Sequence, residues 1–249
     1  MMINMLTMKT QENVLALTVA LILILFTVSG CNKPVRVLSI AGGHAYDTSE
    51  FYQAIYSLEG LSIDTVTHPR AKQILASGRV DSYDVLVFYD FIPGMPLEDS
   101  AIYLELIRQG VPMLFLHHSF CNFQEWEGFS EMVGGKYVMP NSEIDSSLHS
   151  TFKHDIVLEV EVADPLHPVN EGIIDFTILD EGYSNIQINE GIHPLLSTSH
   201  PDCAPLVGWV NQAGNSTCVY LMMGHDKHAY ENESYRQLVQ NAIHWLSDQ

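Results

Sequence analysis

Short apolar runs alternate with segments of helical spacing through the first half of the chain. The runs are typical of strands and lie at 34–41, 62–67, 84–90 and 112–118. The last two are apolar almost throughout, as expected of strands buried on both faces. The intervening segments are predicted helices at 50–58, 71–76 and 97–108, each followed by a glycine. This βαβαβαβ order predicts a parallel sheet with right-handed crossovers, because a twisted sheet accepts its helices with that hand.

The second half departs from this alternation. We predict an exposed strand at 155–162, because polar and apolar residues alternate there. Two further strands at 205–210 and 217–222 flank a turn that contains Gly214 and Asn215, and a helix at 234–246 closes the chain. The pattern contains no internal repeat, linker or low-complexity tract. We therefore predict a single α/β domain over residues 32–249.

The N-terminal segment has the pattern of a lipoprotein signal peptide. Lys9 precedes an apolar run at 14–28, and small residues at Ser29 and Gly30 stand directly before Cys31. We predict cleavage after residue 30 and lipidation of Cys31. This would tether the domain to a membrane of the bacterial cell envelope, outside the cytoplasm and in the periplasm. An uncleaved anchor is the alternative, although a membrane-spanning helix needs roughly 20 apolar residues.

The charge balance restricts the partners. Thirty acidic residues face eleven basic ones, which gives a net charge of −19. A basic stripe that could neutralise phosphates is missing, so nucleic acid is excluded as a partner. Direct binding to anionic lipid head groups is disfavoured for the same reason. The simplest interpretation of the acidic excess is solubility.

The remaining cysteines support no established motif. Cys121, Cys203 and Cys218 are left when Cys31 is assigned to lipid, and no C-x-x-C occurs. A Cys203–Cys218 disulfide is an open alternative, but a hairpin around residues 211–216 would keep the two side chains apart. Cys121 follows a buried strand, where α/β enzymes can carry a nucleophile. Phe120 beside it suits such a tight turn poorly, so we favour an inert cysteine.

Polar residues follow several of the predicted strands. His44 follows the first, Asp90 the third, and His117 with His118 ends the fourth, while His225 and Asp226 follow the strand at 217–222. Ligands of open α/β sheets bind beyond the carboxyl ends of the strands. Each residue alone is more often a satisfied loop or turn residue. Their number at one predicted edge favours a shared functional site.

A second polar cluster begins at Asp180. Glu181 in this cluster could pair with a strand-end histidine, and a carboxylate beside an imidazole is a tunable acid–base pair. A surface turn is the alternative interpretation. Trp126 could either pack in the core or offer a flat face to a sugar ring.

Metal binding is left open by the sequence. Ligand types suited to a divalent metal occur at His44, Asp90, His118, Glu181 and His225. They would have to be gathered from distant loops, and no local signature such as H-E-x-x-H is present. We therefore assign no metal ligands and predict no cofactor.

The order and spacing of these motifs resemble the ThuA-like (trehalose-utilisation) family. The resemblance covers nearly all of the predicted domain and rests on Ile40-Ala-Gly-Gly-His44 with Tyr46, Tyr83 to Asp90, Leu114-Phe-Leu-His-His-Ser119, Trp126, Gly134-Gly135-Lys-Tyr137, His167-Pro168-Val169, Asp180-Glu181-Gly-Tyr183, Trp209, Gly224-His225-Asp226 and Ile243-His-Trp245. It implies a flavodoxin-like three-layer sandwich with a mostly parallel central sheet, akin to class I glutamine amidotransferase domains.

The resemblance also implies a substrate class. The family is associated with trehalose and other disaccharides, often beside sugar oxidoreductases that produce 3-keto-glycosides. Glutaminase chemistry is not expected here, because histidines stand where that chemistry needs a cysteine, and Gly224-His225-Asp226 replaces the expected H-x-E pair. The chain departs from many relatives at Phe115 or Leu116, where they have a glycine.

We therefore expect an enzyme that hydrolyses or isomerises a sugar or keto-glycoside. Glu181 and His225 would serve as general base and acid, and His118 would polarise a carbonyl or hydroxyl. The expected substrate-binding residues are His44, Tyr46, Asp90, His117, Trp126, Tyr183 and Asp226. A non-catalytic, lipid-anchored sugar-binding module is the alternative. The oligomeric state is left open.

Overall fold

A computed structural model describes residues 33–140 and 145–249. Within it, Val35–Gln249 form one compact unit. The predicted signal peptide and Cys31 lie outside the described residues. In the part of the chain that is described, none of the helices has the length and apolar character needed to cross a membrane.

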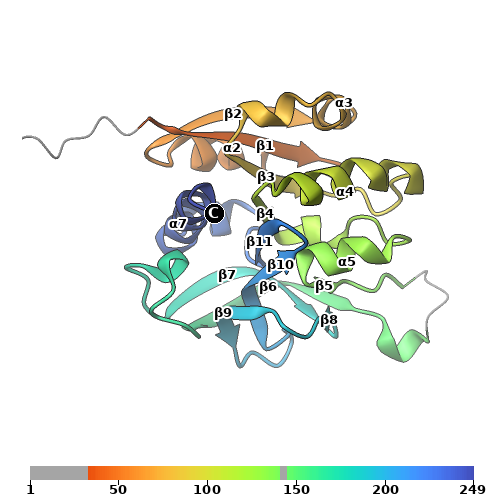
Figure 1. Cartoon of the computed structure of the whole chain (residues 1–249). Helices are drawn as coiled ribbons and strands as arrows, with labels where there is room; N and C mark the ends of the chain where they lie inside the picture. The colour runs from red at the N-terminus through yellow and green to blue at the C-terminus, as the bar shows by residue number, and fades with distance from the viewer. Residues whose placement is uncertain (1–32, 141–144) are drawn as a thin grey trace, which may run out of the picture. The chain divides into compact units, whose positions relative to one another are not determined.

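A nine-stranded sheet forms the centre of this unit (Figure 1). Its strands follow the spatial order β2 (Leu61–Thr67), β1 (Val35–Gly42), β3 (Val85–Asp90), β4 (Met113–Leu116), β11 (Ser216–Leu221), β10 (Leu206–Ala213), β9 (His193–Thr198), β6 (Thr151–Val162) and β7 (Phe176–Ser184). The pairings from β2 to β11 are parallel, and those from β11 to β7 are antiparallel. A separate two-stranded sheet joins β5 (Gly135–Lys136) to β8 (Gln187–Ile188).

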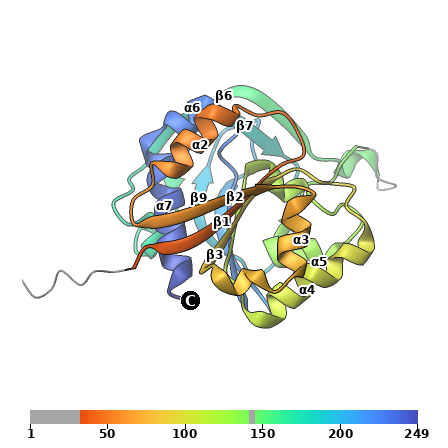
Figure 2. The ribbon, with the colours of Figure 1, turned by 90° about the horizontal axis from the view of Figure 1, so that it is seen from above.

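Helices cover both faces of the parallel part of the sheet. The helices are α2 (Thr48–Tyr56), α3 (Arg70–Ala76), α4 (Ser100–Gln109), α5 (Glu127–Val133), α6 (Lys227–Glu231) and α7 (Glu233–Ser247). Figure 2 shows α2, α6 and α7 on one side of β1 and β3, and α3, α4 and α5 on the other. The predicted α/β sandwich is therefore confirmed, and its parallel sheet continues into an antiparallel extension.

The core lies between the sheet and these two helical layers. All residues of β3 and β4 are buried, which explains why both strands are apolar except for Asp90, the last residue of β3. Phe88 and Phe115 on these neighbouring strands stack with ring centroids 4.9 Å apart. Trp209 on β10 is fully buried and donates its indole N–H to the carbonyl of Val133 at 2.8 Å. That bond attaches the end of α5 to the antiparallel part of the sheet.

Two local differences from the sequence prediction affect the site. The predicted strand at 112–118 ends earlier, and His117–Cys121 form a short 3-10 turn beyond it. Glu181 lies within strand β7 and is buried, so the surface-turn alternative for its cluster is wrong. Long antiparallel pairing with β6 holds this polar segment in the sheet.

Candidate functional site

A cavity of about 310 Å³ opens at the carboxyl ends of the parallel strands. Its polar lining consists of His44, His117, His118, His154, Glu181 and His225. Aromatic and sulfur-containing side chains form much of the remaining wall: Phe91, Cys121, Tyr137, Met139, Phe152 and Tyr183. The volume lies in the range of small-molecule sites, roughly 300–1,000 Å³. This combination of an aromatic wall and converging ionisable groups is typical of a binding or catalytic site.

His117 occupies the first position after β4 and has a positive φ of 45°. Its Nδ1 lies 2.7 Å from the carbonyl oxygen of Met222, so Nδ1 carries the hydrogen and donates it. Its Nε2 therefore presents a lone pair, to which the hydroxyl of Tyr183 donates at 3.0 Å. Burial lowers the pKa of His117 to about 3, so this ring is neutral around pH 7. His117 is thus a fixed acceptor at the base of the cavity.

Asp180 on β7 positions the turn that follows β11. Its carboxylate accepts hydrogen bonds from the backbone N–H groups of Gly224 at 2.8 Å and His225 at 3.0 Å. Burial raises the pKa of Asp180 to about 7, although the backbone N–H donors favour its charged form. Through these bonds the antiparallel half of the sheet sets the place of His225.

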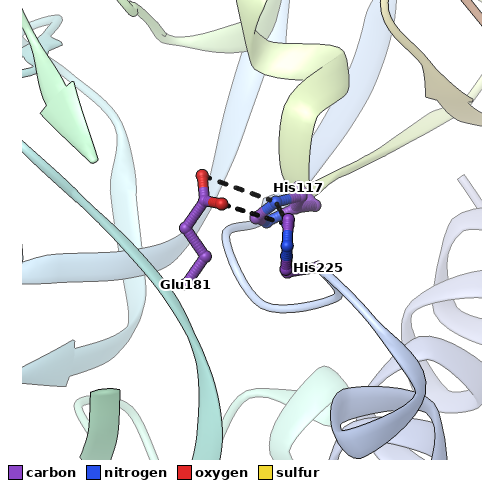
Figure 3. A group of neighbouring side chains, drawn as sticks. All are labelled: His117, Glu181 and His225. Atoms are coloured by element: carbon purple, nitrogen blue, oxygen red, sulfur yellow. Dashed lines mark hydrogen bonds and ion pairs between the residues drawn. The ribbon is translucent and has the colours of Figure 1, made fainter. Parts of the chain in front are cut away.

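Glu181 extends from β7 toward two imidazole rings, as Figure 3 shows. Its Oε2 lies 3.1 Å from Nδ1 of His225, and its Oε1 lies 4.0 Å from Nε2 of His117. The same two ring nitrogens are 3.3 Å apart. Burial, and then the neighbouring Asp180, raise the pKa of Glu181 to about 8. Burial, and then His154, lower the pKa of His225. The three side chains come from three separate segments and meet at one point.

His118 and His44 lie side by side in another part of the cavity wall. Their ring centroids are 4.1 Å apart. Nε2 of His118 is 3.4 Å from the carbonyl oxygen of Tyr89, whereas Nδ1 is buried and has no hydrogen-bond partner among the described residues. Burial lowers the pKa of His118 well below its usual value. A buried ring nitrogen without a partner is uncommon in folded proteins and is suited to receive a ligand donor.

Two of the predicted acidic site residues lie outside the cavity lining. Asp90 is fully buried and bonds to Nε2 of His68 and to Nδ2 of Asn122, each at 2.9 Å. Asp226 caps the start of α6, because its carboxylate accepts from the backbone N–H of His228 at 2.8 Å. Both carboxylates are thus paired with other protein groups and do not line the cavity.

Two predicted aromatic site residues also pack beside the cavity and do not line it. Tyr46 lies edge-on to Tyr89, with ring centroids 5.4 Å apart. Trp126 lies edge-on to Phe123, with ring centroids 5.3 Å apart, and is partly buried against the core. Of the two alternatives that the sequence left open for Trp126, core packing or contact with a sugar ring, the structure shows core packing.

His154 is a site residue that the sequence prediction missed. Its Nδ1 lies 2.7 Å from Oε2 of Glu181, and its ring centroid lies 4.6 Å from that of His225. The residue after it, Asp155, has a φ of 54°, and the pairing of β6 with β7 shifts register there. A polar residue in an exposed strand carries no strong signal, and only the register of β6 against β7 brings it to Glu181.

The cysteines take no part in disulfides within the described residues. Cys121, Cys203 and Cys218 are free thiols. Because Cys203 and Cys218 are both free, the alternative disulfide is not formed. Cys218 pairs with Asn211 across the β10–β11 hairpin. Cys121 borders the cavity, but burial raises its pKa, so it is protonated near pH 7.

The mixed α/β sandwich with a polar cluster at its strand ends defines a protein of the glutamine amidotransferase-like fold class. A glutamine amidotransferase from Thermotoga maritima matches with a TM-score of 0.51 and 12% identity, over 86% of this chain and 99% of that one. The family model of ThuA, described as trehalose utilisation, matches residues 36–246. The chain therefore belongs to the ThuA family, which indicates a role in sugar utilisation.

Two solved ThuA-like proteins share this fold more closely. The protein from Parabacteroides merdae matches with a TM-score of 0.71 and 16% identity, over 86% of this chain and 90% of that one. The protein from Bacteroides uniformis matches with a TM-score of 0.64 and 18% identity, over 86% and 91% of the two chains. No curated protein matches the sequence.

Proposed function

We propose that this ThuA protein is a carbohydrate-processing enzyme that acts on a sugar or keto-glycoside in disaccharide utilisation. The reaction is hydrolysis, or isomerisation next to a ketone, by acid–base chemistry of imidazole and carboxyl groups. The observation that carries the proposal is the convergence of Glu181, His117 and His225 on a single small-molecule-sized cavity. Such a convergence supplies both proton donors and acceptors to one substrate.

The geometry suggests separate roles for the polar groups. The raised pKa of Glu181 and the lowered pKa of His225 favour the reverse of the roles expected from the sequence: Glu181, 3.1 Å from His225, donates a proton to the substrate as acid, and His225 accepts one as base. His154 has half of its side chain exposed and contacts Glu181, so it can pass protons between Glu181 and solvent. Nδ1 of His118 accepts from a substrate hydroxyl and polarises it, which would satisfy this unpartnered atom. His44, His117 and Tyr183 orient the sugar from the cavity wall.

The site is not suited to glutaminase chemistry. That reaction needs a reactive thiolate at the turn after the central strand. His117 takes the first position of this turn, with its positive φ. Cys121 lies at the far end of the turn as a buried thiol with a raised pKa. We therefore expect no hydrolysis of glutamine.

A non-catalytic sugar-binding module is the second candidate. Phe152 lines the cavity while more than half of it is exposed to solvent. An exposed aromatic face at a polar cavity is suited to stacking against a sugar ring.

For both candidate functions, we propose that lipidation of Cys31 holds the domain to a membrane of the bacterial cell envelope on the periplasmic side. The proposed partner is a small sugar, and nucleic acid is not a partner.

Turnover of defined sugars tests the enzymatic proposal. The purified full-length chain is incubated in detergent with disaccharides and their 3-keto derivatives, and products are separated by chromatography. We expect turnover of at least one keto-glycoside, and loss of turnover in Glu181→Gln and in His225→Ala. His193→Ala is the matched control, because its ring pairs with Asp164 at the surface. Saturable sugar binding without turnover would instead support the binding module.

A further inference from the structure

We propose that His117, Glu181 and His225 bind one divalent transition-metal cation of the zinc class, with an open coordination position that faces the cavity. One nitrogen or oxygen atom from each residue can be chosen so that all three lie within 4.8 Å of one another. The inference concerns the cation alone, so it stands or fails without any particular sugar substrate.

The spacing of the ligand atoms fits a small cation. Zinc bonds to imidazole nitrogen and carboxylate oxygen are about 2.0–2.2 Å long, which places tetrahedral ligand atoms roughly 3.3–3.6 Å apart. The two imidazole nitrogens lie 3.3 Å apart, and Nδ1 of His225 lies 3.1 Å from Glu181 Oε2. His117 Nε2 approaches the other carboxylate oxygen of Glu181, Oε1, at 4.0 Å. One ligand atom from each residue already lies within 4.8 Å of the others, and a shift of the Glu181 carboxylate that brings one oxygen toward both nitrogens would complete the set.

The groups behind these ligands resemble the outer shell of a metal site. A ligating histidine usually donates its other ring N–H to a backbone carbonyl or a carboxylate. Nδ1 of His117 does so to the carbonyl of Met222, which leaves Nε2 as the ligand atom. The Tyr183 hydroxyl, which donates to this Nε2 at 3.0 Å, would turn away when the cation binds. Glu181 is in turn contacted by Nδ1 of His154 at 2.7 Å. The ring orientation and tautomer of His117 are thus set before any cation arrives.

The local charge also favours a cation. Asp180 and Glu181 are adjacent, buried carboxyl groups. Among the described residues, no lysine or arginine forms an ion pair with either of them. Burial of carboxylates without a compensating positive charge is costly, and a divalent cation would supply that charge. Two imidazoles and one carboxylate select a transition metal over magnesium or calcium, which prefer oxygen ligands.

A bound cation would change the roles in the proposed reaction. Two histidines and one glutamate leave a fourth position for water or a substrate oxygen, which is the pattern of catalytic zinc sites. Glu181 and His225 would then be ligands of the cation, and the cation would polarise the substrate oxygen. His118 or His154 would donate and accept protons. The sequence assigned no ligands and offered His44, Asp90, His118, Glu181 and His225 only as suitable residue types. The proposed site adds His117, and Asp90 lies outside the cavity lining.

Calorimetric titration of the full-length chain with zinc tests the site. The chain is stripped with a chelator, dialysed and titrated with Zn²⁺ alone, then with Mg²⁺ alone. We expect one Zn²⁺ per chain, no comparable binding of Mg²⁺, and loss of the zinc isotherm in Glu181→Gln and in His225→Ala. His154→Ala should weaken zinc binding roughly 10- to 100-fold, the range of outer-shell changes. Circular dichroism checks that each variant is folded.

His193→Ala is again the matched control, because this surface histidine also pairs with a carboxylate. The proposal is overturned if the stripped chain binds no zinc, or if folded His225→Ala binds it as the parent chain does. Equal loss of binding in His193→Ala would place the zinc at the surface and would also overturn it. Turnover of a sugar by the chelator-stripped chain would support the proposed function and would show that the reaction does not need the metal.

Discussion

Asp180 and Gly224 are joined by a hydrogen bond of 2.8 Å between the buried carboxylate and the backbone N–H, and this bond links strand β7 to the turn after β11. The other carboxylate oxygen accepts from the N–H of His225 at 3.0 Å. The residue that precedes Glu181 therefore also holds the backbone of His225. A single side chain thus sets the distance between the proposed acid and base.

Asp180→Asn should disturb both stability and the site. An amide has one acceptor oxygen, so one of these backbone N–H groups faces an NH₂ group in the variant. We expect the free energy of unfolding to fall by about 1–3 kcal/mol, the cost of a buried unsatisfied donor. Urea denaturation measures this change. Asp164→Asn, at an exposed ion pair with His193, is the control and should stay within about 0.5 kcal/mol. Equal stability of Asp180→Asn and the parent chain would contradict the assigned role.

Tyr183→Phe should weaken the site with little effect on the fold. The hydroxyl of Tyr183 donates to Nε2 of His117 at 3.0 Å, and the two rings stack. Its removal keeps the stacking, so we expect a loss of about 0.5–1.5 kcal/mol in unfolding free energy. Nε2 of His117 is left without this donor, and turnover of the sugar substrate should fall. Steady-state kinetics and thermal unfolding together check this prediction. Unchanged kcat and KM would show that the bond has no catalytic role.

Gly43→Ala should be one of the most damaging glycine changes. Gly43 has a φ of +99°, and a Cβ atom there would lie 2.0 Å from the carbonyl oxygen of Phe91. The backbone must move to relieve this contact, so we expect the free energy of unfolding to fall by at least about 2 kcal/mol. The strain of an alanine in the left-handed region adds to this loss. Gly172→Ala is the matched control, because its φ is +73° and the space around it is open. It should cost about 1–2 kcal/mol. A similar melting temperature for both variants would contradict the prediction.

Cys31→Ala should release the chain from the membrane. The proposed anchor is a lipid on the Cys31 thiol, and alanine cannot be acylated. In bacterial cells that express the chain, we expect the parent protein in the membrane fraction and labelled by a fatty-acid analogue. The variant should be unlabelled. Cys203→Ala serves as the control, because this free thiol lies within the folded unit. Equal labelling of Cys31→Ala and the parent chain would contradict lipidation at this residue.

Local patterns in the sequence carried most of the fold prediction. The strands at β3 and β4 are apolar because they are buried on both faces, and their helices show one apolar side. Strand ends of a parallel sheet share one edge, so His44, His117, His118 and His225 were expected near one another. The structure places all four at the cavity. The family resemblance, which added order and spacing to these patterns, is confirmed by the match over residues 36–246.

Which polar groups meet inside the cavity was decided by the tertiary structure. Asp90 stands at the end of its strand as predicted, but it bonds to His68 and Asn122 from other segments and lies outside the cavity lining. His154 reaches Glu181 only because β6 pairs with β7 and shifts register beside Asp155. Periodicity reports burial along one segment, whereas the partner of a polar atom depends on contacts between segments far apart in the chain. Residue patterns along the chain thus predict the elements and the edge of the sheet where the site lies, and long-range strand pairing selects the residues that form the site.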